Sequence, residues 1–242
     1  MEGGSRKVCE NKGINGGRAP GDGGAAGEAI VYCDFFMRAA LAEAARALEE
    51  GEVPVGCVFV RVESSTITQA QLDTTSSANC ATLEKLIVAR GRNATNRECH
   101  SLAHAEFAAV DALMRNAVAC AGESGDTGKS IPASLADYVL YVAVEPCIMC
   151  AAMLLYNQVK KVYFGCGNPR FGGNGTVLRV HMPCKAGENN GVSDSIAGYE
   201  SCGGYRAEEA VALLQRFYSH ENANAPPGKR KRKGVLRERS NC

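Results

Sequence analysis

The sequence YVLYVAVEPCIMCAAMLLY, at residues 138–156, is the longest apolar stretch of this 242-residue chain. Glu145 and Pro146 interrupt the stretch, so it predicts a strand, a turn and a helix and not a membrane span. The chain is 45% hydrophobic, which is enough to build a full core. We therefore expect one domain with appended segments.

Shorter apolar runs on both sides of this stretch predict the remaining elements. Before it we expect a helix over 35–50 that Asp34 caps and Gly51 ends, strands over 53–60 and 85–90, and a helix that ends near Arg115. After it, a strand covers 160–165 and an amphipathic helix covers 206–218. This order of helices and strands predicts an α/β fold in which one mixed sheet lies between helices, a three-layer α/β/α domain over residues 31–220.

Composition sets the limits of that domain. Residues 1–30 hold nine glycines and few apolar side chains, which predicts a disordered amino terminus. The segments near 61–82 and 120–136 are polar, and we expect them to be surface insertions. The last segment, 221–242, is a basic tail.

The charge of the chain is concentrated at this end. Residues 229–239 contain seven lysines and arginines and one glutamate, a net charge of +6, which leaves −5 on the rest of a chain of formal charge +1. An acidic body with a strongly basic tail predicts a polyanionic partner. A nuclear-localisation patch or a solubilising tail is the alternative reading of KRKRKGVLRER.

The cysteines and the amino terminus bear on the compartment. No apolar signal segment begins the chain, and the twelve cysteines do not have the pattern of a disulfide framework. We expect reduced thiols and a location in the cytoplasm, the nucleus or both. No contact with a membrane is expected.

Cys147 and Cys150 are the one pair of cysteines with metal-ligand spacing. Pro146 suits the first turn of a helix, so both cysteines lie on one face at a helix start. The positive end of the helix dipole lowers thiol pKa values and favours the thiolates that a metal needs. Two cysteines alone are also compatible with a redox pair.

The stretch LAHAEFAAVDAL, at residues 102–113, supplies a nitrogen ligand and a carboxylate. We expect Ser101 to cap a helix that carries His104 in its first turn, with Glu106 two residues further on. Three protein ligands leave the fourth position of a zinc ion open for water, which is typical of a catalytic site. A neighbouring carboxylate can then take up and return protons.

Each motif has an ordinary structural explanation when it stands alone, but together they match one pattern. H-x-E followed by P-C-x-x-C is the known signature of zinc-dependent nucleobase deaminases. We therefore predict one catalytic Zn²⁺ held by His104, Cys147 and Cys150, with Glu106 as the proton shuttle. Hydrolytic removal of an amine from cytosine or from adenine fits this signature equally well.

Further motifs narrow the choice by resemblance. EVPVGCVFV, GRNATN before AHAEF, EPCIMCAAML and FGCGNPRFGGNG resemble the tRNA-specific adenosine deaminases of the cytidine and deoxycytidylate deaminase superfamily. The ending GYRAEEAVALLQRFYSHENANAP and the basic tail resemble the catalytic subunits of the heterodimeric enzymes of eukaryotes. The resemblance covers most of residues 35–233 and implies a cytidine-deaminase-like fold. It also implies conversion of the wobble adenosine of tRNA to inosine, with a catalytically inert homologous deaminase subunit as partner.

The same resemblance implies roles for residues outside the zinc motif. Asn93 matches an asparagine that contacts the target nucleoside, and Val55 matches a residue that lines the base pocket. As alternatives, Asn93 is a turn residue and Val55 a core residue. Arg170 lies in a turn by composition and, by resemblance, near the anticodon as a phosphate contact. For the tail we expect tRNA binding through Lys229, Arg230, Lys231, Arg232 and Lys233.

Three other functions remain open at this point. The chain could be a cytidine or nucleobase deaminase on the same fold, which the basic tail and the tRNA-type motifs disfavour. It could be a non-catalytic zinc subunit that binds tRNA, although an inert homologue typically lacks the glutamate that Glu106 supplies. It could also be a zinc-dependent RNA-binding module without chemistry.

Overall fold

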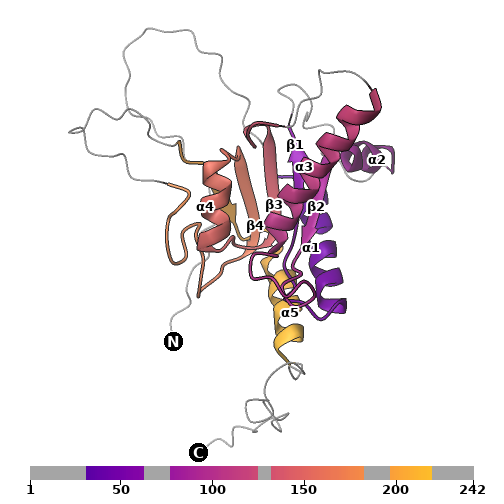
Figure 1. Cartoon of the computed structure of the whole chain (residues 1–242). Helices are drawn as coiled ribbons and strands as arrows, with labels where there is room; N and C mark the ends of the chain where they lie inside the picture. Colours follow the sequence, from indigo (N-terminus) through magenta and orange to yellow (C-terminus); the bar gives the residue numbers. More distant parts are fainter. Residues whose placement is uncertain (1–30, 63–76, 125–131, 183–196, 220–242) are drawn as a thin grey trace, which may run out of the picture.

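The structure is a computed structural model, and it describes residues 31–62, 77–124, 132–182 and 197–219. These residues form five helices and five strands (Figure 1). In chain order the elements are α1 (Asp34–Glu49), β1 (Gly56–Arg61), α2 (Ser77–Leu86), β2 (Ile87–Arg92), α3 (Ala105–Ser124), β3 (Tyr138–Val144), α4 (Ile148–Tyr156), β4 (Lys161–Cys166), β5 (Glu200–Gly203) and α5 (Ala207–Ser219).

The strands form one sheet in the order β2-β1-β3-β4-β5. Strand β1 pairs antiparallel with both β2 and β3, whereas β3, β4 and β5 run parallel. The sheet is therefore mixed, as the sequence predicts. Because β2 and β3 both run opposite to β1, their carboxyl ends lie at the same edge of the sheet.

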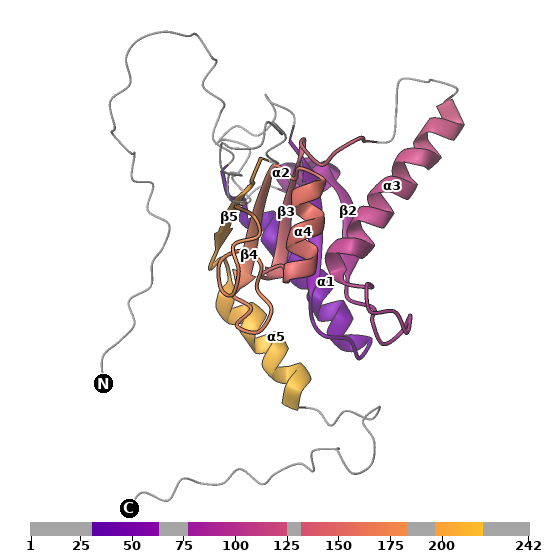
Figure 2. The ribbon, with the colours of Figure 1, turned by 60° about the vertical axis from the view of Figure 1, so that its left-hand side comes forward.

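Helices cover both faces of the sheet, so the domain has the three predicted layers (Figure 2). On one face α1 and α5 pack on a core that includes Phe36, Met37 and Tyr141. On the other face α3 and α4 pack on a core that includes Phe59, Leu140 and Leu154. Alternate residues of β1 and β3 enter the two cores, since successive side chains of a strand point to opposite faces.

Two differences from the predicted elements lie in the polar segments. The segment 61–82 contains the start of α2, which runs on to Leu86, so β2 begins at Ile87 and not at residue 85. Leu83 of α2 is 1% exposed and joins the core under α1, which gives this polar helix its anchor. Helix α3 continues to Ser124, nine residues past the predicted end near Arg115, because alanines maintain the helix into the expected insertion.

The sequence also left β5 unpredicted. Its four residues have an exposed or half-buried pattern, without an apolar run to mark a strand. They become a strand because the free edge of β4 supplies partners from Lys161 to Phe164. Edge pairing of this kind depends on tertiary context and not on local propensity.

The sequence predicts that Asp34 caps α1, and this prediction is wrong. Cys33 holds the cap position and offers no side-chain cap bond, while Asp34 lies in the first turn. The Asp34 carboxylate instead accepts hydrogen bonds from Nε and Nη2 of Arg206, at 2.7 and 2.8 Å. This two-point contact joins the start of α1 to the residue before α5.

A glycine sets the position of α3 on the sheet. A Cβ on Gly91 would lie 2.1 Å from the carbonyl oxygen of Ala105 and 2.6 Å from the nitrogen of Ala109. Only glycine allows the first turns of α3 to approach β2 this closely. The start of α3 is thereby fixed against the sheet.

Several predictions concern parts of the chain outside the described residues. They are the predicted disorder of the amino terminus, the parts of the two insertions at 63–76 and 125–131, and the tail with Lys229, Arg230, Lys231, Arg232 and Lys233. Within the part that the structure describes, none of the helices combines the length and the apolar character that crossing a membrane requires.

Candidate active site

Two helices start beside each other at the edge where β2 and β3 end. A loop leads from β2 to His104 and α3, and Glu145 and Pro146 lead from β3 to Cys147 and α4. The amino end of β1 reaches the same edge, since Gly56 pairs with Arg92. The topology of the sheet thus brings together motifs that are about 40 residues apart in the chain.

His104, Cys147 and Cys150 are close enough to bind one metal ion. Their ligand atoms all lie within 4.8 Å of one another. Nδ1 of His104 is 3.6 Å from Sγ of Cys147 and 3.6 Å from Sγ of Cys150. A tetrahedral ion with Zn–N of about 2.05 Å and Zn–S of about 2.3 Å places a nitrogen and a sulfur roughly 3.6 Å apart. The donor set and its spacing therefore fit zinc, as predicted.

The local backbone differs slightly from the prediction for both helix starts. Cys147 is the cap residue of α4, and its sulfur accepts the Cys150 N–H at 3.5 Å, so Pro146 precedes the helix. His104 immediately precedes α3, and its carbonyl oxygen accepts the Ala108 N–H at 2.9 Å. Ser101 lies three residues before His104 and is not the cap. A residue at the edge of a helix can aim its side chain beyond the helix end.

The electrostatics of the site favour a thiolate at Cys147. The Cys150 thiol, His104 and the Cys150 N–H all donate to its sulfur and hold the pKa of Cys147 down at about 4. The same contact with Cys147, together with burial, raises the pKa of Cys150. The hydrogen bond to Cys147 raises the pKa of His104. A divalent cation would replace the shared protons and neutralise this cluster of negative charge.

Glu106 lies in the first turn of α3, next to the ligands. It is 3% exposed, and burial raises the pKa of its carboxyl, followed by the negative charge of Cys147. A buried carboxyl group beside the metal ligands is placed to take up and release a proton, which a general acid–base catalyst must do.

Asn93 and Val55 lie side by side at this edge of the sheet. The Asn93 N–H donates to the carbonyl oxygen of Val55 at 3.0 Å, and the Asn93 side chain is 5% exposed. Val55 is half-buried and contacts both core clusters. The substrate roles of both residues remain predictions.

Arg170 is exposed on a loop that packs on the start of α4. The Ile148 N–H donates to the Phe171 oxygen at 2.8 Å, and the Gly173 N–H donates to the Pro146 oxygen at 2.9 Å. The predicted turn is present, since the Asn168 side chain accepts the N–H groups of Arg170 and Phe171. The predicted phosphate contact of Arg170 requires RNA and stays a prediction.

Sequence reasoning missed two buried carboxylates that shape the site. Glu145 is 2% exposed and accepts the backbone N–H groups of Asn168, Asn174 and Thr176 at 2.9–3.0 Å. Glu52 is 0% exposed and holds the loop after β2 in a similar way. An acidic residue inside an apolar run, as in GEVPVG and VAVEPC, was the available signal, because burial of a charge requires compensating donors.

The sheet, the paired helix starts and a His-Cys-Cys site beside a buried glutamate define a zinc-dependent deaminase. The family model "Cytidine and deoxycytidylate deaminase zinc-binding region" matches residues 74–166, which include the three ligands and Glu106. The predicted fold and zinc cofactor are confirmed.

Comparison with known proteins narrows the class. The chain is 37% identical over 198 residues to tRNA-specific adenosine deaminase 2 of Xenopus tropicalis, covering 82% of this chain and 95% of the relative. It is 32% identical over 205 residues to the tRNA-specific adenosine deaminase subunit tad2 of Schizosaccharomyces pombe, covering 84% and 42%. The tRNA-specific adenosine deaminase of Bacillus subtilis is 30% identical over 171 residues, covering 71% and 84%. The chain belongs to the tRNA-specific adenosine deaminase family, which confirms the resemblance.

Proposed function

We propose that this chain catalyses the zinc-dependent hydrolytic deamination of adenosine to inosine at the wobble position of tRNA anticodons. The observation that carries the proposal is the joint presence of a complete ligand set and the buried carboxyl of Glu106, in a chain of the tRNA-specific adenosine deaminase family. The reaction consumes one water and releases one ammonia.

The ligands and Glu106 divide the chemistry between them. His104, Cys147 and Cys150 would hold the zinc ion, which would lower the pKa of water for attack on the ring carbon that carries the amine. The Glu106 carboxylate takes a proton from the attacking water and transfers it to the adjacent ring nitrogen. The second proton comes from the hydroxyl group now bonded to the ring carbon and passes through Glu106 to the amine, which leaves as ammonia while the carbonyl of inosine forms.

Asn93 and Val55 complete the nucleoside pocket in this proposal. Both lie at the sheet edge where the metal ligands converge, and their backbones are joined directly. Arg170 and the basic residues 229–233 would contact phosphates of the tRNA. The exposure of Arg170 and the positive charge of the tail support these proposed phosphate contacts.

The partner in the proposal is a catalytically inert homologous deaminase subunit. Large apolar side chains are exposed on α4 and on the loop bonded to its start: Tyr156 (71%), Phe171 (61%) and Met182 (60%). Apolar surface of this kind is typical of a protein interface. We expect the chain alone to be inactive or nearly so, and a monomer that turns over tRNA efficiently would contradict this part of the proposal.

Sequencing of cDNA from treated tRNA tests the proposed function, because inosine pairs with cytosine during reverse transcription and is therefore read as guanosine. The chain is incubated, with and without the homologous subunit, with a tRNA that carries adenosine at the wobble position. We expect conversion at that position by the complex. The Glu106→Gln variant should keep its zinc and bind tRNA, but lose at least about 10²-fold in rate.

A matched control changes the same charge away from the reaction. Glu98→Gln alters an exposed residue whose described side-chain contact is with Arg97, and it should retain full activity. Absence of conversion by the zinc-loaded complex would refute the function. Conversion by Glu106→Gln at the wild-type rate would refute the role of Glu106.

A further inference from the structure

Glu52 is a fully buried carboxylate in the turn between α1 and β1, and it holds the loop that begins with Asn93. Its Oε1 accepts the Arg97 N–H at 2.7 Å. Its Oε2 accepts the Asn96 N–H at 3.2 Å, the Asn93 amide Nδ2 at 3.2 Å and the Thr95 hydroxyl at 3.3 Å. Four donors from residues 93–97 thus compensate one buried charge.

This contact dictates which way the Asn93 amide points. An ionised carboxylate only accepts hydrogen bonds, so the Asn93 NH₂ group and not its oxygen must face Glu52. The second amide hydrogen goes to Oγ1 of Thr95, at 3.0 Å. The Thr95 hydroxyl in turn donates to Glu52, so the three side chains form a closed set with one consistent direction for every hydrogen.

The remaining polar atom of Asn93 is its carbonyl oxygen, Oδ1. Among the described residues this oxygen has no hydrogen-bond partner. It is also not completely buried. Asn93 therefore has a hydrogen-bond acceptor, and no donor, left for another partner.

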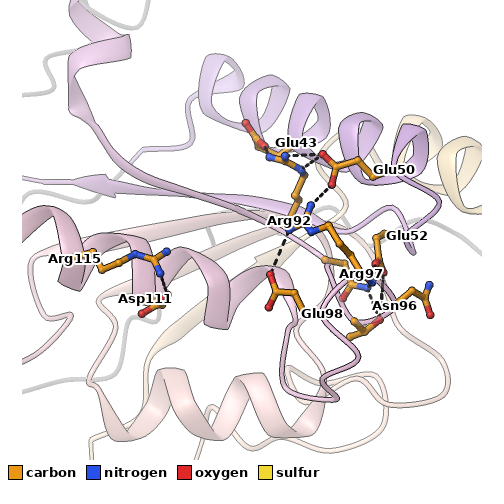
Figure 3. Close-up of polar contacts among 11 residues, drawn as sticks. Glu43, Glu50, Glu52, Arg92, Asn96, Arg97, Glu98, Asp111 and Arg115 are labelled. Atoms are coloured by element: carbon orange, nitrogen blue, oxygen red, sulfur yellow. Dashed lines mark hydrogen bonds and ion pairs between the residues drawn. The ribbon is translucent and has the colours of Figure 1, made fainter.

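The outer side of the same loop is held by charge pairs that Figure 3 shows. Arg97 forms an ion pair with Glu50 at the end of α1, and Arg92 of β2 pairs with Glu50 at 2.6 Å and with buried Glu43 at 3.2 Å. The Ala94 N–H closes the loop onto the Ala103 oxygen at 2.9 Å, next to the metal ligand His104. Movement of the Asn93 side chain is thus restricted by the inner contact with Glu52, on a loop already anchored outside.

We propose that Glu52 is the positioning residue that makes Asn93 a hydrogen-bond acceptor for the target nucleoside. This inference rests on the proposed function and names how that site reads its substrate. In an adenosine within an RNA chain, the donor groups are the ribose 2′-hydroxyl and the exocyclic amine. Asn93 Oδ1 accepts a hydrogen bond from one of these two groups. Glu52 fixes the orientation of the Asn93 amide, so that the acceptor is available before the substrate binds.

The Glu52→Gln substitution tests this assignment because it keeps the shape and adds a donor. The introduced amide would place an NH₂ group against the loop, and Asn93 would turn its oxygen inward to accept from it. The substrate would then meet an amide donor where it needs an acceptor. We expect kcat/KM for tRNA to fall between about tenfold and a hundredfold, the usual cost of one unpaired buried polar group.

A double-mutant cycle separates this role from general support of the loop. In an Asn93→Ala background the Glu52→Gln substitution should have little further effect on kcat/KM, since the acceptor that it reorients is already absent.

Thr95→Val is a milder second variant, which leaves one hydrogen of the Asn93 amide without an acceptor. Its smaller loss of kcat/KM should also vanish in the Asn93→Ala background. Glu98→Gln, with the same change of charge on the same loop, should match the wild type. Zinc content is measured for every variant.

Substrates distinguish the two possible donors. With 2′-deoxyadenosine at the target position, the Glu52→Gln effect disappears if the donor is the ribose hydroxyl and persists if it is the amine. If Glu52→Gln costs the same factor with and without Asn93, or costs nothing with full zinc, the positioning role is wrong.

The orientation of the amide is also measurable without catalysis. The side-chain NH₂ signals of Asn93 in ¹H–¹⁵N NMR spectra should be slowly exchanging in the wild type and shift strongly in Glu52→Gln. Unchanged signals would overturn the inference even if the enzyme deaminates tRNA. Conversely, a wild-type complex that fails to deaminate tRNA refutes the proposed function, while the NMR result still decides the role of Glu52.

Discussion

Gly91 offers the sharpest test of how the sheet positions the metal site. In Gly91→Ala the new Cβ would stand 2.1 Å from the Ala105 oxygen, although real contacts essentially never fall below 3.0 Å. The first turn of α3 must therefore retreat from β2 by about 0.9 Å, because the obstructing atoms are backbone and cannot rotate away. His104 and Glu106 flank Ala105 and would move with it.

The size of the effect follows from the tolerance of a metal site. Ligand distances in zinc sites vary by only about 0.2 Å, so a shift of roughly 0.9 Å at one of three ligands cannot be absorbed by the bonds themselves. We expect zinc affinity to fall at least about tenfold and kcat/KM about a hundredfold. Overpacking of the core should lower the free energy of unfolding by about 1–3 kcal/mol.

The assay is competition for zinc with a chelator of known affinity, together with thermal unfolding and tRNA deamination. Gly204→Ala is the matched control, because its Cβ meets nothing within 4 Å but its backbone φ of +99° disfavours alanine. That variant should lose a comparable amount of stability and keep its zinc affinity. Wild-type zinc affinity in a folded Gly91→Ala protein would refute the reasoning.

Three further predictions concern other parts of the chain. Cys147→Ala should lose zinc, because it removes the thiolate ligand with the lowered pKa, and full zinc by elemental analysis would contradict the ligand set. Asp34→Asn should lower the free energy of unfolding by about 1 kcal/mol near neutral pH, a modest value since the pair with Arg206 is partly exposed. The Arg206 hydrogen bonds lower the pKa of Asp34 in the folded protein, so this stabilisation is complete above about pH 5 and declines as the pH falls through about 4. Urea unfolding across that range should show the difference between wild type and variant shrinking, and a constant difference would exclude the charge pair as its cause. Deletion of everything after Pro227 should weaken tRNA binding by the complex and flatten the slope of log affinity against log salt by about 0.7–0.9 per lost phosphate contact. Zinc content and thermal stability should not change, and equal affinities with parallel slopes would show that the tail does not touch RNA.

The long apolar strand β3 and the amphipathic helices could be predicted from sequence because their signal is local. Strand β3 covers Tyr138–Val144, the apolar run that ends where Glu145 interrupts it, since burial on both faces requires an uninterrupted apolar run. Strand β5 and helix α2 lack such a signal, because edge pairing stabilises the first and one buried leucine anchors the second. Asp34 shows the same limit. A capping role is typical for its position, but its carboxylate accepts hydrogen bonds from Arg206, 172 residues away in the chain.

The spacing of His104, Glu106, Cys147 and Cys150 was enough to predict the metal, its ligands and the kind of reaction from the sequence. Those residues have few other reasons to occur together, so chemistry restricts their pattern more strongly than folding does. The side-chain directions at the site follow from the fold alone: Nδ1 of His104 faces the two sulfurs, Glu52 and Glu145 hold the neighbouring loops, and the NH₂ group of Asn93 faces Glu52. Each of these depends on the direction of a side chain relative to atoms far away in the sequence. Directions of this kind are set by close packing and by the need to satisfy buried polar groups, and both exist only once the chain has folded.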